Sequence, residues 1–317
     1  MTSGEILLAC LLDAVLGDPR WLPHPVRLMG WAIAWCDERI RPVLRSPAGE
    51  RVAGIVLAVG LPVLAYAVGW LAIEMAGRVH WVFGRGVEVV LACTTLAARD
   101  LADHALSVVR ALEAGRLQGA REAVSRIVGR DTAELSESDV ARATVETVAE
   151  STSDGVIAPL FYMVIGGAPL ALAYKAVNTL DSMVGHRDRK HRYFGWASAK
   201  CDDGANWIPA RVTAVLLVLA GGLIFRNADT IRRAWRIFVR DGKKHPSPNS
   251  GRPEAAMAGV LGVQLGGTNV YAGVPSARPP LGDPGAPLDA HHIRSALWLM
   301  TLSVLLAAGL AAVLRLL

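Results

Sequence analysis

The segment VAGIVLAVGLPVLAYAVGWLAI, residues 52–73, contains no Asp, Glu, Lys, Arg or His side chain. A helix needs about 20 apolar residues to cross the hydrocarbon core of a bilayer, which is about 30 Å thick. Residues 295–314 are equally free of charge. The whole chain is 52% hydrophobic and 19% charged, whereas about 25% of the residues in soluble domains are charged. These features predict an all-α fold, that of a polytopic helical membrane protein.

The apolar segments before the middle of the chain differ in length and continuity. Residues 5–16 and 26–36 predict two short helices on either side of the turn GDPRWLPHP, and residues 86–98 are expected to return through the bilayer beside 52–73. The segment VIAPLFYMVIGGAPLALAY, residues 156–174, carries Gly-Gly and Pro at its centre. Glycine and proline weaken a helix, so we expect a broken or re-entrant helix there.

Residues 99–151 differ from their surroundings in composition. Charged residues recur, and the apolar residues thin out to helical spacing. Ser136 followed by Asp139 is a capping pattern, which predicts the start of a third helix in this segment. We therefore expect a small helical, soluble, cytoplasmic insert inside a single membrane-embedded catalytic domain that covers residues 1–317.

The distribution of Lys and Arg leaves the topology open. Residues 175–211 and 226–252 are both rich in these residues, and basic loops favour the cytoplasmic side. The apolar segment between them, 212–225, is short for a span because Arg211 precedes it. A full crossing would place one basic segment outside, so we expect a partial or tilted segment, or a site sunk within the membrane.

The glycine-rich segment near the C-terminus is expected to be helical at first. Its proline and apolar residues predict a helix from Pro253 to about Leu265, in which Gly262 and Gly266 suit close helix packing, with contact to a ligand as the alternative. The sequence Gly-Gly-Thr-Asn would then break this helix at membrane depth. Residues 275–289 are expected to form a flexible loop rich in proline and glycine.

Four polar blocks beside apolar segments are candidates for chemistry. The first is DAVLGDPRWLPHPVR, residues 13–27, in which prolines stiffen a turn that carries Arg20, His24 and Arg27. An ordinary surface loop with an ion pair explains this block equally well, because Asp and Arg often pair in turns.

The second block is ETVAESTSDG, residues 146–155. Glu146 and Glu150 are four residues apart and share a helical face, and Asp154 follows just beyond. Like charges at this spacing destabilise a helix unless a cation joins them. Mg²⁺ accepts such carboxylates and keeps waters and substrate phosphates as its other ligands. The alternative is an exposed acidic helix end.

The third block follows the broken apolar segment. Lys175, Asn178 and Asp181 recur at helical spacing and form a polar stripe. Ionisable groups at membrane depth are costly, so they are functional candidates, although a ladder of hydrogen bonds between helices is the alternative. Asp202 and Asp203 form a carboxylate pair that can hold a divalent ion.

The fourth block is HPSPNSGR, residues 245–252, before the predicted helix. His245, Asn249, Ser250 and Arg252 would lie near the helix N-terminus, where free backbone N–H groups and the helix dipole attract anions. Asn269 would lie at the inner end. This arrangement predicts an anion or phosphate site.

Several common site motifs are missing from the sequence. There is no G-x-x-x-x-G-K-[ST] loop, no dinucleotide-binding G-x-G-x-x-G, no G-x-S-x-G and no H-E-x-x-H. The net charge of +5 is modest, and no RNA- or DNA-binding motif occurs. The remaining carboxylates, amides and cations suit Mg²⁺-dependent handling of phosphates at a membrane, without a nucleic-acid partner.

Six blocks resemble, in matching order, the adenosylcobinamide-phosphate synthase family, the integral-membrane amide synthases of cobalamin biosynthesis. They are LLDAVLGDPRWLPHPVRLMG, IVGRDTAEL, ESTSDGVIAPLFY, YKAVNTLDSMVGH, DDGANWIPAR and HPSPNSGRPEAAMAGVLGVQLGGTNVYAGV. The resemblance implies a ligase that uses ATP and Mg²⁺ to join adenosylcobyric acid, a corrinoid, to (R)-1-amino-2-propanol or its O-phosphate. It also implies a multi-pass protein of the cell (inner) membrane whose active site faces the cytoplasm. Its expected partners are these substrates, membrane lipid, and a second copy of the chain or other enzymes of the pathway.

Under this resemblance the candidate residues take three kinds of role. Catalytic roles, including proton transfer from the amine, are expected for His245, His24, Asp181 and Lys175. Binding of phosphate, propionate or other substrate groups is expected for Arg20, Arg27, Asn178, Arg211, Asn249, Ser250, Arg252 and Asn269. Coordination of Mg²⁺ is expected for Glu150, Asp154, Asp181, Asp202 and Asp203.

Two other functions are compatible with parts of the sequence. A transporter of a corrinoid or another anion would explain polar residues among apolar helices, but no inverted repeat of broken helices is visible. A CDP-alcohol phosphotransferase is suggested by Asp203-Gly204 before Ala210-Arg211. Its motif requires further aspartates soon after the arginine, and the next one is Asp229.

Overall fold

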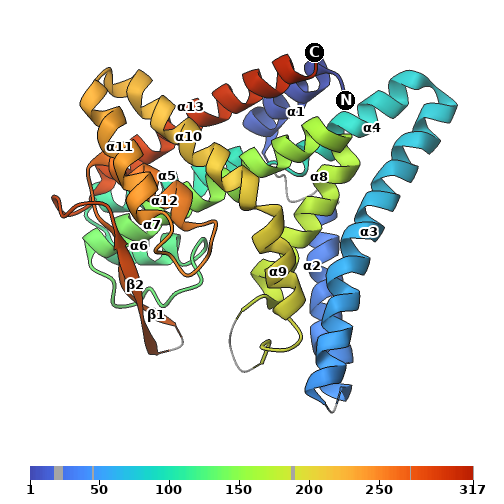
Figure 1. Cartoon of the computed structure of the whole chain (residues 1–317), viewed down its shortest axis with the longest axis horizontal. Coiled ribbons are helices and arrows are strands. Elements are labelled where there is room, and N and C mark those ends of the chain that lie inside the picture. Colours follow the sequence, from blue (N-terminus) through green and yellow to red (C-terminus); the bar gives the residue numbers. More distant parts are fainter. Residues whose placement is uncertain (18–23, 45, 187–189, 272, 317) are drawn as a thin grey trace. The chain divides into compact units, whose positions relative to one another are not determined.

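The computed structural model describes residues 1–17, 24–44, 46–186, 190–271 and 273–316. Figure 1 shows the helices and strands of the chain along its sequence. The chain divides into two compact units. Unit 1 consists of Met1–Ala97, Ala158–Asn206 and Ala308–Leu317. Unit 2 consists of Ala98–Ile157 and Trp207–Ala307. The predicted soluble insert therefore belongs to unit 2, the residues that follow it up to Asn206 belong to unit 1, and the chain re-enters unit 2 at Trp207.

Unit 1 is built from helices. They are α1 (Ser3–Leu16), α2 (Pro25–Trp35), α3 (Pro47–Val79), α4 (Trp81–Cys93), α8 (Ala158–Val184) and α9 (Trp196–Ala205), with a π-helical and a 3₁₀ turn at Cys36–Ile40 and Arg41–Val43. The long helix α3 begins at Pro47 and is capped by Ser46, whose hydroxyl accepts a hydrogen bond from the Gly49 N–H. It packs against α4, α8 and α9. The predicted hairpin of spans is therefore present, although α3 extends beyond residues 52–73 at both ends.

Helix α8 is broken where the sequence predicts a break. Gly166 and Gly167 leave the helical conformation, with φ angles of −140° and 70°. The positive φ of Gly167 is one that a residue with a Cβ rarely adopts. Pro169, two residues later, has no N–H to continue the hydrogen-bond ladder. The prediction of a broken apolar helix at 156–174 is confirmed.

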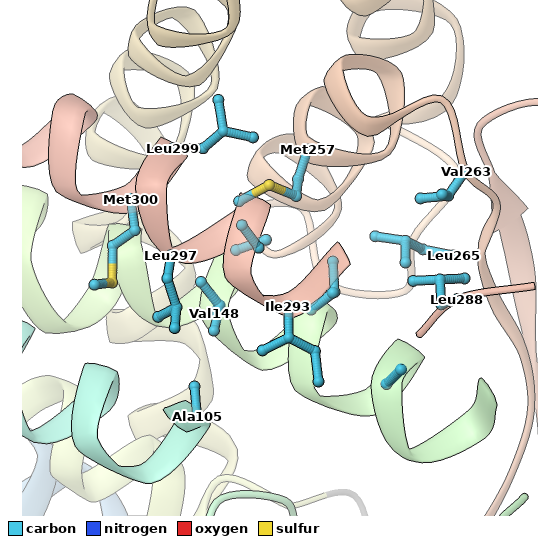
Figure 2. Close-up of a cluster of buried hydrophobic side chains, with 14 of the residues drawn as sticks. Ala105, Val148, Met257, Val263, Leu265, Leu288, Ile293, Leu297, Leu299 and Met300 are labelled. Atoms are coloured by element: carbon cyan, nitrogen blue, oxygen red, sulfur yellow. The ribbon is translucent and has the colours of Figure 1, made fainter. Parts of the chain in front are cut away.

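Unit 2 contains helices and a β hairpin. The helices are α5 (Ala98–Glu113), α6 (Leu117–Val124), α7 (Glu137–Thr152), α10 (Trp207–Phe225), α11 (Ala228–Asp241), α12 (Gly251–Leu261) and the first part of α13 (Ala290–Leu314), and the strands are β1 (Leu265–Tyr271) and β2 (Val274–Leu281). Residues from both of its chain segments form one core, which includes Ala105, Val148, Met257 and Leu297 (Figure 2). The predicted insert is helical, and it shares this core with residues 207–307.

The predicted start of α7 is confirmed. The Ser136 hydroxyl accepts a hydrogen bond from the Asp139 N–H, and the Asp139 carboxylate accepts one from the Ser136 N–H, which together form a capping box.

The hairpin replaces part of a predicted helix and part of a predicted loop. Helix α12 ends at Leu261, because Gly262 adopts a left-handed conformation with φ of 72°. Gly266, with φ of 87°, lies in β1 and not in a helix, so the predicted Gly262–Gly266 helix packing is wrong. Strand β2 pairs antiparallel with β1, with Asn269 opposite Ser276. Val274–Leu281 is therefore a strand and not the beginning of a flexible loop.

The segment 212–225 is part of a longer helix than predicted. Helix α10 begins at Trp207, contains Arg211 and is 19 residues long. Arg211 lies within the first turns of this helix and does not end it. Its guanidinium lies 4.1 Å from the centre of the Trp207 ring. The length and composition of α10 permit a full crossing, which corrects the expectation of a segment too short to span.

Within the described residues, five helical stretches are long and apolar enough to cross a membrane. They are Pro47–Val79, Trp81–Glu113, Glu137–Val184, Trp207–Phe225 and Ala290–Leu314. Many large apolar side chains of α3, such as Val63 and Leu64, are exposed, as expected for a surface that faces lipid. The protein is a polytopic helical membrane protein, as the sequence predicts.

Candidate functional site

A buried ionic network in unit 2 is centred on Glu146 of α7. Its carboxylate accepts hydrogen bonds from Arg130 (2.5 Å), from Arg142 (3.2 Å) and from the backbone N–H of Gly266 (2.8 Å). Arg142 lies one helical turn before Glu146, so the two side chains share a face. The spacing of Glu146 and Glu150 predicts a cation beside them. For Glu146 the cations are the guanidinium groups of Arg130 and Arg142.

The same network anchors the hairpin. The Asn269 side-chain oxygen on β1 accepts hydrogen bonds from Arg130 (2.7 Å) and Arg142 (3.2 Å), and Arg142 also donates to the Gly266 carbonyl (2.5 Å). The Asp131 N–H donates to the Val270 carbonyl at 2.8 Å. Asn269, a predicted substrate-binding residue, therefore positions β1 through its carbonyl oxygen.

A second polar group surrounds His245, between α11 and α12. The Ser247 N–H donates to its Nδ1 at 3.1 Å, and its Nε2 lies against the guanidinium of Arg278 on β2. Both ring nitrogens therefore face N–H groups, which disfavours the doubly protonated imidazolium. Burial, and then the charge of Arg278, lower the pKa of His245. The imidazole is held neutral, the form that a general base requires.

Two carboxylates lie beside His245. Glu150 Oε1 accepts a hydrogen bond of 2.6 Å from the Ser250 hydroxyl. Glu254 Oε1 lies 3.9 Å from His245 Nε2. Burial raises the pKa of Glu254 well above its usual range, and the charges of Glu146 and Glu150 raise it further. This group joins α7, the 245–250 segment, α12 and β2.

Arg211 and Arg252 form a like-charged pair in unit 2. They lie close enough for their charges to repel, and Arg252 Nε is buried without a hydrogen-bond partner among the described residues. The N-terminus of α12 offers fewer free N–H groups for anion binding than the sequence predicts. Pro253 has no N–H, and the N–H groups of Arg252 and Glu254 bond to the carbonyls of Asn249 and Ser250. An anion here would bind mainly to the guanidinium side chains.

Unit 1 contains a separate carboxylate site. Asp202 Oδ1 accepts hydrogen bonds from the side-chain amides of Asn206 (2.9 Å) and Asn178 (3.5 Å). The Tyr174 hydroxyl donates to the Asn206 side-chain oxygen at 2.8 Å. Burial, and then the charge of Asp181, raise the pKa of Asp202 to about 7. The two carboxylates are therefore close neighbours, as the predicted polar stripe and the Asp202–Asp203 block require.

The predicted site residues fall in both units. Unit 1 contains His24, Arg27, Lys175, Asn178, Asp181, Asp202 and Asp203, and unit 2 contains Glu150, Asp154, Arg211, His245, Asn249, Ser250, Arg252 and Asn269. His24 precedes the first residue of α2 and is buried. Asp154 lies in the π-helical turn after α7. Arg20 lies outside the described residues.

The described residues do not include a cluster of three or more His, Cys, Asp or Glu side chains with the geometry of a metal site. The predicted Mg²⁺ ligands occur instead as smaller sets. Asp181 and Asp202 are together in unit 1, where Asp203 pairs with Lys200 at 3.0 Å. Glu150, in unit 2, bonds to Ser250. Mg²⁺ is commonly held by one or two carboxylates plus water and substrate phosphates, so the pair in unit 1 suits it.

Several polar residues of these sites were not among the predicted site residues. Arg130, Arg142, Arg278, Glu254, Tyr271 and Asn206 are the main ones. Arg142 and Glu146 stand four apart in the sequence, a signal that could have paired them. Arg278 could not be found in this way, because only strand pairing brings β2 to His245.

These features define a multi-pass helical membrane protein with buried ionic sites that suit anionic and cationic ligands. The chain belongs to the CobD/Cbib family, because the family model described as "CobD/Cbib protein" matches residues 6–300. It is 52% identical over 316 residues to a protein of Geobacter metallireducens named "Cobalamin biosynthesis protein CobD", covering 98% of each chain. Proteins with the same name from Pelobacter propionicus and Klebsiella pneumoniae are 45% and 44% identical over 96% and 98% of this chain, and 92% and 96% of their own. No solved structure matches the chain.

Proposed function

We propose that the protein is a membrane-embedded amide synthase of cobalamin biosynthesis. It joins a propionate of adenosylcobyric acid to (R)-1-amino-2-propanol or its O-phosphate, with ATP and Mg²⁺. The family and its relatives' names support a biosynthetic role and do not favour transport. The unsatisfied guanidinium of Arg252 is the observation that carries the chemistry, because its Nε is buried without a hydrogen-bond partner among the described residues and the charge of Arg211 acts on the same region, which suits a phosphate.

The proposed reaction has two steps. An oxygen of the propionate attacks the γ-phosphorus of ATP, which gives an acyl phosphate and ADP. The amine nitrogen then attacks the acyl carbon, and the carbon–oxygen bond to phosphate breaks, which gives the amide, inorganic phosphate and a proton. The activation is needed because a bare carboxylate is a poor electrophile. We place this chemistry on the cytoplasmic side of the cell membrane, where ATP is present.

Mg²⁺ fits the carboxylate pair of unit 1. Asp202 Oδ1 accepts the amide hydrogen bonds, and within the described part of the chain no donor contacts Oδ2. Asp181 and Asp202 would hold the ion, which would supply positive charge to the phosphates of ATP. Asn178 and Asn206 would keep the Asp202 carboxylate in a fixed orientation, as partners of metal ligands commonly do.

His245 is the proposed base for the proton of the amine. Its neutral state is favoured by burial and by Arg278, and it lies beside the carboxylates Glu150 and Glu254. Because the Ser247 N–H and the Arg278 guanidinium face the two ring nitrogens in the free protein, proton acceptance requires one of these contacts to open. A negatively charged substrate group near Tyr271 and Arg278 would favour the opening of the Arg278 contact.

Product formation tests the proposal. Detergent-solubilised protein is incubated with adenosylcobyric acid, aminopropanol phosphate and Mg·ATP, and the amide is sought by mass spectrometry. We expect product in the wild type and an increase of about 10- to 100-fold in the KM for ATP or the aminopropanol phosphate in Arg252→Gln, because one charge-assisted contact is lost. Arg232→Gln is the matched control, since Arg232 is exposed and its ionic partner among the described residues is the exposed Asp229. A folded wild type that yields neither amide nor ADP contradicts the proposal.

A further inference from the structure

Glu254, in the first turn of α12, is a buried carboxylate that the protein itself leaves unsatisfied. The residue is only 6% exposed. Among the described residues, no donor makes a hydrogen bond to it, and its nearest charged or imidazole contact is His245 Nε2 at 3.9 Å. Burying a carboxylate without hydrogen bonds is costly. The contacts of the fold therefore do not account for a glutamate at this position.

Two other carboxylates lie near Glu254. Glu146 is paired with Arg130 and Arg142. Among the described residues, the Glu150 carboxylate accepts one hydrogen bond, from the Ser250 hydroxyl, and its charge reaches both Glu254 and His245. Arg278 is directed at His245 and at the Tyr271 hydroxyl (3.1 Å). The charges of Glu146 and Glu150 oppose the ionisation of Glu254, and those of Arg278 and Arg130 offset them only in part.

We propose that Glu254 and Glu150 bind the primary ammonium group of the amine substrate, an inference that rests on the proposed amide synthesis. A positive charge on the ligand would offset the repulsion between the Glu150 and Glu254 carboxylates. The three N–H donors of an ammonium group match the oxygen lone pairs that the protein leaves unused. Arg278, which contacts His245 beside these carboxylates, would repel a divalent ion more strongly than an ammonium group.

A binding measurement without ATP or corrinoid tests the pocket directly. Calorimetric titration of the detergent-solubilised full chain compares 1-amino-2-propanol with 1,2-propanediol, in which a hydroxyl replaces the ammonium group. We expect saturable binding of the amine and weakening by about 10-fold or more both for the diol and for the amine with Glu254→Gln. Glutamine has the same shape as glutamate, so this variant is expected to fold, and Glu150→Gln provides an independent second variant.

Glu113→Gln is the matched control, because Glu113 belongs to the same unit and is an exposed partner of Arg294. It should bind the amine as the wild type does. Equal binding of amine and diol, or unchanged amine affinity in both Glu254→Gln and Glu150→Gln, overturns the inference. Glu254-dependent binding of Mg²⁺ alone that displaces the amine also overturns it, since the pocket would then be a metal site.

A kinetic measurement separates this inference from the proposed function. If the wild type makes the amide and the KM for the amine is the same in Glu254→Gln, the inference fails and the synthase assignment stands. If amine binding depends on Glu254 but no amide forms with any combination of substrates, the pocket is supported and the proposed reaction is wrong. An increased KM for the amine with a smaller change in kcat supports both.

Discussion

Glu146 is the residue on which the interior of unit 2 depends most directly. It accepts hydrogen bonds from two guanidinium groups and from the backbone of β1. Glu146 is only 6% exposed, and Arg142 is 9% exposed. The side chains of Arg130 and Arg142 have little access to water. The Glu146 carboxylate therefore offsets much of the free-energy cost of burying their charges.

Replacing Glu146 by alanine is expected to destabilise the protein strongly. The variant leaves Arg130 without its carboxylate partner and leaves Arg142 with Asp139 alone, and the loss of one partner of a buried ion pair costs about 3–5 kcal/mol. Thermal unfolding in detergent should show a lower Tm for Glu146→Ala. Glu137→Ala, at the exposed first turn of α7, is the control. Equal Tm values for the two variants would show that the network does not stabilise the fold.

Asp241 provides a test of pH dependence at the end of α11. Its buried carboxylate accepts hydrogen bonds from Arg240 and from the Gly282 N–H, and it pairs with Lys244. These partners hold its pKa well below its usual range. A lowered pKa stabilises the folded state at pH values above the unfolded pKa of about 4, and this stabilisation is lost as the pH falls toward the folded value.

We therefore expect the Tm difference between wild type and Asp241→Asn to be constant from about pH 7 to pH 5 and to shrink below about pH 4. Thermal unfolding at a series of pH values measures it. A difference that grows as the pH falls would mean that the ionised carboxylate does not stabilise the folded protein.

At the scale of elements, the end of α12 sets the start of the hairpin. Gly262 has φ of 72°, and Arg233 of α11 donates to the carbonyls of Gly259 (2.8 Å) and Val260 (3.0 Å). A Cβ at Gly262 would lie 3.3 Å from the Arg233 guanidinium. The last turn of α12 is thus ended by a left-handed glycine and capped by a cation, both favourable at a helix C-terminus.

Gly262→Ala is expected to destabilise unit 2 by about 1 kcal/mol or more, because alanine is strained at this φ. Hydrogen exchange should quicken in β1 and at the end of α12. Gly119→Ala in α6 is the control, since a Cβ there makes only ordinary contacts at 3.8 Å. Slower exchange or unchanged stability in Gly262→Ala would contradict the role of this glycine.

Local signals in the sequence predicted some elements and could not predict others. The capping box at Ser136 and the break at Gly166 depend on neighbouring residues, so the sequence contains the whole signal. The hairpin depends on pairing between β1 and β2, and its proline-rich second strand resembles a loop. Arg278 reaches His245 only through that pairing, which is why sequence alone found His245 and missed its partner.

At the scale of the molecule, the two units contain sites of different character. Unit 1 has exposed apolar helices and the Asp181–Asp202 carboxylates, and unit 2 has the guanidinium pair and the ionic networks. The five candidate spans include segments from both units. The proposed metal ligands therefore lie in unit 1, and the proposed phosphate-binding arginines lie in unit 2.

Removing one carboxylate of unit 1 should change the metal requirement. We expect Asp202→Asn to need at least about 10-fold more Mg²⁺ for half-maximal amide formation, because one of two charged ligands is lost. Titration of Mg²⁺ at saturating ATP measures this. Glu74→Gln, which removes an exposed carboxylate of α3, should leave the requirement unchanged. An unchanged Mg²⁺ requirement in both Asp202→Asn and Asp181→Asn would remove these residues from the metal site.

The transfer of oxygen from the propionate to phosphate tests the proposed acyl phosphate. Adenosylcobyric acid labelled with ¹⁸O in its free propionate is incubated with the amine and Mg·ATP, and amide and inorganic phosphate are analysed by mass spectrometry. We expect the amide product together with one ¹⁸O atom in each phosphate released, because the acyl carbon–oxygen bond breaks after phosphorylation. Amide formation with unlabelled phosphate would contradict the acyl phosphate, and the absence of amide from folded protein would contradict the synthase assignment itself.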